Sequence, residues 1–254
     1  MPDVRDSVTV LGCRVDALDA SQAVARVVAL AAGEGPSAVV TLGTEMAVRA
    51  WRDARFRSVL NASALSLCDT VGVLYAARRR GLRLASRVTG VDLIDPLCAA
   101  LAERAIPLFL LGSRGDTADR VATVLERAHP GLRIAGARDG YFADADSAAV
   151  AAEIRASGAR IVLVGLGSPR QEFWLADHLS ATGCAVGIGV GGSFDVIAGN
   201  VRRAPEWWRR AGLEWLYRLA SEPRRWRRQL ALPAFVALAL GEHIFPSASR
   251  RYVA

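Results

Sequence analysis

Five short stretches of this sequence combine glycine with the polar side chains that bind phosphates and sugars or transfer protons. They are TLGTE (41–45), CDTVG (68–72), LGSRG (111–115), GLGSPRQE (165–172) and GVGGSFD (189–195). Glycine lets backbone N–H groups approach a ligand closely, and a helix N-terminus attracts phosphate. Each turn alone is also an ordinary strand-to-helix connection. Together they predict a nucleotide-type pocket, provided that the fold brings them to one edge.

The glycines that we expect to bring backbone N–H groups to the ligand are Gly112, Gly165 and Gly167. The stretch around Gly167 is not a dinucleotide-binding GxGxxG motif, because Arg170 takes the place of the third glycine. A P-loop is excluded, since the sequence contains no lysine. The three histidines are isolated, and no paired aspartates stand at a strand end. We therefore expect neither a metal nor a cofactor.

The elements that must position these turns alternate along the chain. Short apolar runs predict strands at 38–41, 64–68, 107–112, 133–135, 160–165 and 185–190. Helical patterns lie between them, near 20–32, 44–60, 70–80, 91–104, 115–128, 146–157 and 170–181. This alternation predicts an α/β fold, with a mostly parallel, Rossmann-like sheet covered by helices on both faces.

In such a sheet, ligands bind beyond the carboxyl ends of the strands, where all five turns are expected to lie. The N-terminal segment VTVLGCRVD predicts a small additional strand pair. A change of composition near residue 200 divides the chain into an α/β domain, 1–199, in which we expect the active site, and a basic appendage, 200–254.

Composition favours one substantial core in a reducing compartment. The chain has 254 residues, of which 52% are hydrophobic. Its four cysteines show no CxxC spacing, and three of them lie in apolar patterns, which predicts buried thiols. We see no signal peptide and no apolar run of about 18 residues. A cytoplasmic location is expected.

The positive charge is concentrated in the appendage. Residues 200–228 carry nine arginines and three glutamates, which gives +6, whereas residues 1–199 are neutral. Four of the six tryptophans lie in the same basic stretch. Arginine with tryptophan is typical of helices that bind a membrane surface. A nucleic-acid site is not expected, since no such motif accompanies the patch. A packed or solvated helical face remains an alternative.

Nine motifs occur in the order and spacing found in the WecG/TagA/CpsF glycosyltransferases, known as glycosyltransferase family 26, and the resemblance covers about residues 8–228. The motifs are TLGTEM, LCDTVGV, RVTGVDL, LLGSRG, DGYF, VGLGSPRQE, GVGGSFD, AGNVRRAP and GLEWLYRLASEPRR. The resemblance implies an inverting, metal-independent transferase. Its donor would be a UDP-sugar and its acceptor a lipid-diphosphate-linked sugar. The reaction would take place at the inner face of the cell membrane, which residues 200–245 would bind.

The resemblance also assigns roles to residues of the body. Asp69 matches the proposed catalytic base, which takes the proton of the acceptor hydroxyl. Its alternative role is the N-cap of the following helix. Arg87 matches a pocket position that would meet the charge of the leaving diphosphate, with a surface cation as the alternative. Thr41 and Gln171 match polar positions that contact the sugar or the diphosphate.

Other positions are assigned less directly. Glu172 is a further candidate for contact with the substrate. The alternative for Gln171 is an exposed residue of the first helical turn, and the alternative for Glu172 is a carboxylate that only stabilises the helix dipole. Tyr141 and Asp195 are candidates for the uridine end, with a core tyrosine and a turn aspartate as alternatives. Many family members read TxN where this chain reads Thr41–Leu42–Gly43. The contact of that asparagine would be lost, or would pass to Thr44 or Glu45, so the sugar is left open among hexoses such as N-acetylmannosamine.

The appendage, by the same resemblance, closes over the site and brings an arginine to the diphosphate. Arg218 and Arg224 are the nearest candidates. Two rival functions remain: a nucleotide-binding module without transferase activity, and a structural protein of the membrane surface. The residues leave open whether the chain forms a homo-oligomer.

Overall fold

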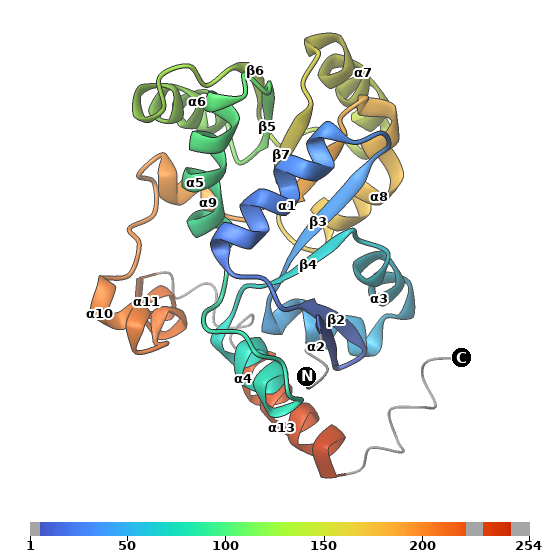
Figure 1. Ribbon diagram of the computed structural model, residues 1–254, viewed down its shortest axis with the longest axis vertical. Helices are drawn as coiled ribbons and strands as arrows, with labels where there is room; N and C mark the ends of the chain where they lie inside the picture. Colours follow the sequence, from blue (N-terminus) through green and yellow to red (C-terminus); the bar gives the residue numbers. More distant parts are fainter. Residues whose placement is uncertain (1–5, 222–230, 245–254) are drawn as a thin grey trace.

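A six-stranded sheet, in which all neighbouring strands run parallel, forms the centre of the computed structural model, which describes residues 6–221 and 231–244. The strand order is β4-β3-β8-β7-β5-β6 (Figure 1). The strands are β3 (Ser37–Leu42), β4 (Leu65–Cys68), β5 (Leu108–Gly112), β6 (Ile134–Arg138), β7 (Ile161–Gly165) and β8 (Val186–Gly189). The predicted α/β class with a parallel sheet is confirmed.

Helices cover both faces of this sheet. One face carries α1 (Ala20–Ala32), α5 (Gly90–Glu103), α6 (Thr117–Ala128) and α9 (Ser193–Ile197). The opposite face carries α2 (Thr44–Arg52), α3 (Ala54–Asn61), α7 (Ser147–Ser157) and α8 (Arg170–Thr182), and a 3-10 turn, η1 (Asp144–Asp146), precedes α7. The same side, near β4, holds α4 (Val71–Arg79) and the antiparallel pair β1 (Ser7–Val10) and β2 (Cys13–Asp16), so the predicted N-terminal strand pair is confirmed.

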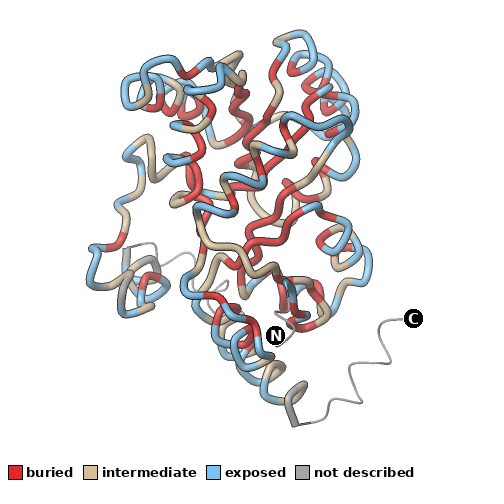
Figure 2. The backbone as a smooth tube through the Cα atoms, viewed as in Figure 1, coloured by how far each residue is buried: buried red, intermediate tan, exposed pale blue. Residues whose placement is uncertain are grey.

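The central strands are buried on both faces because apolar side chains alternate between two layers of helices (Figure 2). Val39 and Leu67 pack with α1 and α5, whereas Val40 and Leu42 pack with α2 and α4. Such strands read as continuous apolar runs, which is why the sequence shows them clearly. All four cysteines are buried free thiols, as predicted.

The predicted helix at 44–60 is wrong in one respect, because two helices occupy it. Asp53 interrupts the helical backbone with an extended conformation, and its Oδ1 accepts a hydrogen bond from the backbone N–H of Phe56 at 3.0 Å. An aspartate that competes for backbone N–H groups favours a helix start over a helix interior. The second helix, α3, therefore begins at residue 54.

Among the described residues, the body is followed by the helices α10 (Glu206–Arg210), α11 (Glu214–Ser221) and α13 (Ala231–Ile244). α13 lies beside α4 (Figure 1), and Phe235, only 2% exposed, belongs to the apolar cluster beneath α2 and α4. Glu242 accepts a hydrogen bond from the backbone N–H of Leu11 at 3.1 Å and pairs with Arg80. One side of α13 is thus attached to the body, and Val236 and Leu240 are exposed on its other side.

No helix within residues 6–221 and 231–244 combines the length and the apolar character that crossing a bilayer would require.

Candidate active site

The five glycine-containing turns meet at the carboxyl edge of the sheet, as the sequence predicts, since each follows a strand of one parallel sheet. The helix after β3, α2, leaves toward one face, whereas the helix after β8, α9, leaves toward the other. Because β3 and β8 are neighbours, their turns diverge there. A crevice between diverging turns is where open α/β sheets bind ligands.

Gly112 and Gly165 are required by close backbone packing. Gly112 has a φ of 147°, and a Cβ there would lie 2.6 Å from backbone atoms of Gly165. A Cβ at Gly165 would in turn lie 3.0 Å from the carbonyl oxygen of Gly191. Gly167, with a φ of 78°, borders open space instead. Three strand ends thus approach closely because they lack side chains, and contact of these glycines with a substrate stays a prediction.

Asp69 and Arg87 lie on adjacent segments at the end of β4. The backbone N–H of Asp69 donates to the carbonyl of Leu42 at 3.1 Å, and that of Val88 donates to the carbonyl of Cys68 at 2.7 Å. The residue after Cys68 and the residue before Val88 are therefore held side by side. The N-cap of α4 is the next residue, Thr70, so the alternative role of Asp69 as that cap is wrong.

Cys68 is not a nucleophile in this site, although it borders both charged residues. Burial raises the pKa of its thiol to about 12; the negative charge of Asp69 adds to this, and the positive charges of Arg87 and Arg78 oppose it. A thiol with such a pKa carries almost no thiolate near neutral pH. The role of Asp69 as the base stays a prediction.

Gly43 leaves space beside that carboxylate. A Cβ at this position would lie 3.7 Å from Oδ2 of Asp69 and 3.4 Å from Cγ2 of Thr70, both ordinary contact distances. The φ of −103° suits any residue, so the backbone does not require glycine. The neighbouring Thr44 donates its backbone N–H to Oγ1 of Thr70 at 3.2 Å. A contact of Thr44 with substrate, which stays a prediction, would use its hydroxyl.

Thr41, Gln171 and Glu172 are polar side chains buried around the end of β8. The hydroxyl of Thr41 donates to the carbonyl of Gly189 at 3.0 Å. Oε1 of Gln171 accepts from the backbone N–H of Gly191 at 3.0 Å, and its Nε2 donates to Oε1 of Glu172 at 2.7 Å. The alternative of an exposed Gln171 is wrong, since it is 3% exposed. These groups shape the turn after β8, and their contacts with a sugar stay predictions.

Glu172 is buried with one carboxylate oxygen, Oε2, that has no hydrogen-bond partner among the described residues. Burial raises the pKa of this carboxyl, against the opposing effect of hydrogen bonds from Gln171 and Ser168 and of the charge of Arg49. Burying a carboxylate without full pairing is costly, so folding shifts the equilibrium of this carboxyl toward its neutral form relative to the unfolded chain.

Glu172→Gln is therefore expected to raise Tm by an amount that grows with pH. Unfolded glutamate loses its proton near its ordinary pKa of about 4.3. The folded carboxyl holds its proton to higher pH, so wild-type stability is fullest below the ordinary pKa and falls as pH rises through the raised one. Glutamine has no such dependence. Thermal unfolding at about pH 5 and about pH 8 tests this, with Glu126→Gln on the exposed side of α6 as the control. A gain in Tm that does not depend on pH would contradict it.

Tyr141 lies at the surface, in the turn after β6. Its side chain is 71% exposed, so the alternative of a core tyrosine is wrong. The guanidinium carbon of Arg114 lies 5.3 Å from the centre of its ring, a cation–π distance. Arg170 donates hydrogen bonds to the carbonyls of Gly140 and Phe142, both at 2.7 Å, and thereby holds this turn. The exposed ring is free to stack on a planar base.

Asp195 joins the same part of the edge through the turn after β5. Its Oδ1 accepts from Nδ2 of Asn200 at 3.2 Å, and its Oδ2 lies 3.5 Å from the hydroxyl of Ser113. The carbonyl of Ser113 accepts from the backbone N–H of Gly140 at 2.8 Å. The two residues predicted for the uridine end, Tyr141 and Asp195, therefore border one turn.

Arg87 is paired with a residue that sequence reasoning did not assign. Its Nη2 lies 2.8 Å from Oε2 of Glu214 in α11, and the side chains are 18% and 11% exposed, so the alternative of a surface cation is wrong. The pair joins residues 127 positions apart, which no local pattern reveals. The sequence analysis also gave no role to Arg114 and Arg170. Both lie within the glycine-containing turns, so their positions alone could have marked them as candidate site residues.

A second ion pair joins Asp92 of α5 to Arg203. Burial alone would raise the pKa of the Asp92 carboxyl, but hydrogen bonds from Thr89 and Arg203, with the charges of Arg203 and Arg87, outweigh it and hold the pKa below its ordinary value. Asp92 is therefore a carboxylate near neutral pH, and it fixes Arg203 on the body.

The two tail arginines predicted to reach the diphosphate are not placed. Arg218 belongs to α11 by its backbone, but its side chain is not among those described. Arg224 lies outside the described residues. Their roles stay predictions.

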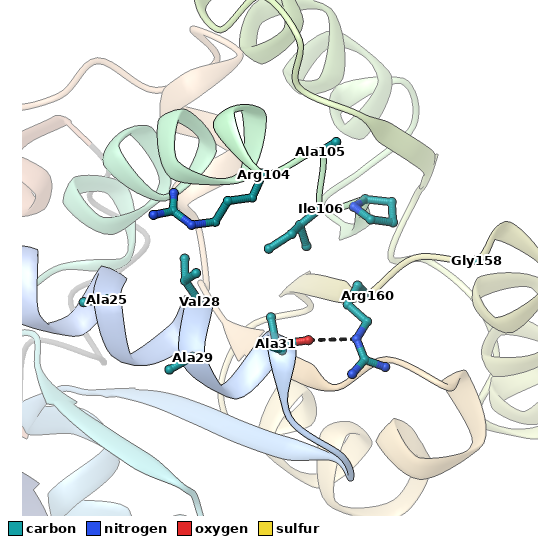
Figure 3. Close-up of a pocket in the computed structure, with 11 residues that line it drawn as sticks. Ala25, Val28, Ala29, Ala31, Arg104, Ala105, Ile106, Gly158 and Arg160 are labelled. Carbon is teal, nitrogen blue, oxygen red and sulfur yellow. Dashed lines mark hydrogen bonds between the residues drawn. The ribbon is translucent and has the colours of Figure 1, made fainter.

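A groove of about 600 Å³ lies at the opposite, amino edge of the sheet (Figure 3). It is lined by the end of α1, by the end of α5 and by residues just before β5 and β7, including Pro107 and Arg160. Arg160 donates through Nε to the carbonyl of Ala31 at 2.8 Å. The five turns contribute no lining residue, so this groove is separate from the candidate active site.

Across the part of the chain that the structure describes, no three His, Cys, Asp or Glu side chains gather in a group that could hold a metal ion.

The chain matches the model of the Glycosyl transferase WecG/TagA/CpsF family over residues 8–249. It is 37% identical over 204 residues to the N-acetylglucosaminyldiphosphoundecaprenol N-acetyl-beta-D-mannosaminyltransferase of Bacillus subtilis (strain 168), covering 80% of this chain and 79% of that protein. The identity is also 37% over 214 residues, 84% of this chain and 82% of the relative, for the protein of the same name from Bacillus spizizenii.

Proposed function

This chain belongs to the WecG/TagA/CpsF family of glycosyl transferases, and from that premise we propose that it moves a sugar from a UDP-sugar onto a polyprenyl-diphosphate-linked sugar. The relatives are named for the transfer of N-acetylmannosamine to N-acetylglucosaminyl-diphosphoundecaprenol. N-acetylmannosamine or a related hexose is the proposed sugar here. The product would serve the synthesis of a cell-surface polysaccharide or a teichoic-acid-type polymer.

One observation carries the proposal: the carboxylate-bearing Asp69 and the cationic Arg87 occupy adjacent segments at the ligand-binding edge. An inverting transfer needs a base on one side of the sugar and a cation near the leaving group. The arrangement supplies both within a single turn region. A nucleotide-binding module without transferase activity would not need a carboxylate at this place.

The proposed reaction is a single displacement at the anomeric carbon. Asp69 accepts the proton of the acceptor hydroxyl, whose oxygen forms the new bond to that carbon from the face opposite the diphosphate. The bond between the anomeric carbon and the phosphate oxygen breaks, and its electron pair leaves with UDP. The configuration at the carbon is inverted.

The leaving UDP gains negative charge, which the site has to stabilise. Arg87 is the described cation at this edge that we assign to the diphosphate, and backbone N–H groups of the turn containing Gly167 are proposed to add to it. We propose that Arg218 or Arg224 of the appendage supplies a further guanidinium. Thr41 and Gln171 are assigned to the sugar or the diphosphate, and Tyr141 with Asp195 to uridine.

The appendage is proposed to hold the enzyme against the inner face of the cell membrane. Of the ten large apolar side chains that are exposed among the described residues, six lie in the appendage: Trp207, Leu213, Trp215, Leu216, Val236 and Leu240. They accompany the +6 charge of residues 200–228. Exposed apolar side chains with arginines suit an anionic lipid surface, where the acceptor lipid would be anchored.

The experiment that tests this function measures UDP release from a panel of UDP-sugars, with a polyprenyl-diphosphate-linked N-acetylglucosamine as acceptor. Acceptor-dependent release from one donor, with a product whose anomeric configuration is inverted, would support the proposal. UDP binding without release from any donor would favour the nucleotide-binding module instead.

Transfer is expected to continue in excess EDTA. The proposed scheme stabilises the diphosphate with arginine and backbone N–H groups, so that a divalent cation is not needed. Turnover with and without EDTA, with a Mg²⁺-dependent transferase treated in parallel as the control, measures this. Loss of turnover that added Mg²⁺ or Mn²⁺ restores would overturn the scheme.

A further inference from the structure

The appendage contacts the segment around the proposed donor site through two ion pairs. Glu214 of α11 pairs with Arg87, and Arg203, which precedes α10, pairs with Asp92 at the start of α5. Ala204, the residue that follows Arg203 in the chain, is buried. The appendage therefore lies on residues 87–92, the segment that carries the arginine assigned to the diphosphate.

The turn before α11 packs against the start of α4, at Val71. Gly212 has a φ of 74°, and a Cβ there would lie 3.2 Å from Cγ2 of Val71, the first residue of α4. Val71 stands two positions after Asp69 in the chain. The turn before Glu214 is thus held next to the segment of the proposed base, and the carboxylate of Glu214 reaches Arg87.

We infer that Glu214 is a positioning residue, which holds the guanidinium of Arg87 in the orientation that receives the donor diphosphate. The inference rests on the function proposed above. Arginine has a long side chain with many rotamers, and ordering it costs conformational entropy. An ion pair formed before the substrate arrives meets that cost in advance, so that the guanidinium is preorganised.

The geometry favours positioning over competition between Glu214 and the donor. The pair is made through one nitrogen, Nη2, at 2.8 Å. A guanidinium carries five N–H donors in a planar fork and can bind two anions on different edges. Arg87 can therefore keep Glu214 while it binds a phosphate oxygen. In a purely competitive contact, removing the carboxylate would strengthen UDP binding.

The test compares two glutamate-to-glutamine variants of the full chain. Glu214→Gln removes the charge that faces Arg87. Glu242→Gln is the matched control, because Glu242 also ties the appendage to the body, through Arg80 and Leu11, and lies in α13. We expect Glu214→Gln to lower kcat/KM for the donor about tenfold or more, and Glu242→Gln to change it less than about twofold.

The same glutamine substitution in an Arg87→Met background shows whether Glu214 acts through Arg87. If it does, Glu214→Gln has almost no further effect on donor kcat/KM when Arg87 is absent. Glu214→Asp, which keeps the charge on a shorter side chain, is expected to recover part of the loss. Thermal unfolding of each variant shows whether it is folded. If Glu214→Gln is not, Glu214→Asp takes its place in the comparison.

Three results would overturn the inference: equal losses in the two glutamine variants, an undiminished loss in the Arg87→Met background, or tighter UDP binding in Glu214→Gln. The first two would leave Glu214 as an attachment of the appendage, and the third would make it a competitor of the donor. A wild-type protein that releases UDP from no donor would instead count against the proposed function. Calorimetric binding of UDP to wild type and Glu214→Gln remains informative in that case.

Discussion

Replacing Asp69 by asparagine is expected to reduce sugar transfer by about 10² or more, while UDP still binds within a few-fold of the wild-type affinity. General-base catalysis contributes roughly 10²–10⁴ to rate, and an amide cannot accept the hydroxyl proton. Asparagine has nearly the shape of aspartate, so it fits the space between Gly43 and Thr70. The loss should appear in kcat, since the base acts in the transition state.

Single-turnover transfer and calorimetric binding of UDP separate these two effects. Asp116→Asn provides the matched control, because Asp116 is an exposed carboxylate at the same edge of the sheet, in the turn after β5, which three strands separate from β4. Transfer by Asp69→Asn within a few-fold of wild type would remove Asp69 from the chemistry. A loss of UDP binding of the same size would make it a donor-binding residue.

Replacing both Val236 and Leu240 by serine is expected to weaken binding to anionic vesicles by about 10-fold to 10². The two side chains are 49% and 53% exposed, and they project from α13 away from the buried Phe235. Fully burying an exposed Val or Leu side chain is worth about 1.5–3 kcal/mol, and about half of each side chain is still exposed here, so the pair contributes about 1.5–3 kcal/mol. The fold should be unaffected, because neither side chain belongs to the core cluster.

Co-sedimentation with anionic and neutral vesicles, at low and at high salt, measures this effect. Val124→Ser is the matched control, since Val124 is a 42% exposed residue of α6, outside the appendage. The attraction of the arginines should weaken with salt, whereas the apolar part should persist. Unchanged recovery of the double variant with the vesicles would show that the outer side of α13 does not meet lipid.

The strands and the edge at which their turns meet were predictable, because both follow from local patterns. Val39 to Leu42 and Ile161 to Gly165 are buried on both sides and therefore read as apolar runs. The parallel arrangement then places all strand ends together without knowledge of any contact. The break between α2 and α3 was missed, although Asp53 was a usable signal.

The connections between the appendage and the body were not predictable from sequence. In α13 almost every residue is apolar, so no periodicity shows that Phe235 faces inward and Leu240 outward. The pairs of Glu214 with Arg87 and of Glu242 with Arg80 join distant positions in the chain. Only the fold determines which of many arginines meets which carboxylate.

The chemical role of Asp69 came from the resemblance to a family, since many aspartates stand at strand ends. The structure adds a reason that the residues alone could not supply, namely its place beside Arg87. It also shows that Gln171 and Glu172 are hydrogen-bonded to each other, and that Gln171 accepts a hydrogen bond from the turn after β8. These bonds shape the turn after β8, and contact of the two side chains with the substrate stays a prediction.

The burial of Phe235 in the cluster beneath α2 and α4 makes the completion of that cluster a late event in synthesis. Chains fold progressively as they leave the ribosome, N-terminal parts first. Because α13 is made long after α2 and α4, the apolar surface beneath these two helices stays uncovered until α13 has left the ribosome. Since α4 begins two residues after Asp69, this side of the candidate site is completed only then, together with the helix proposed to meet the membrane.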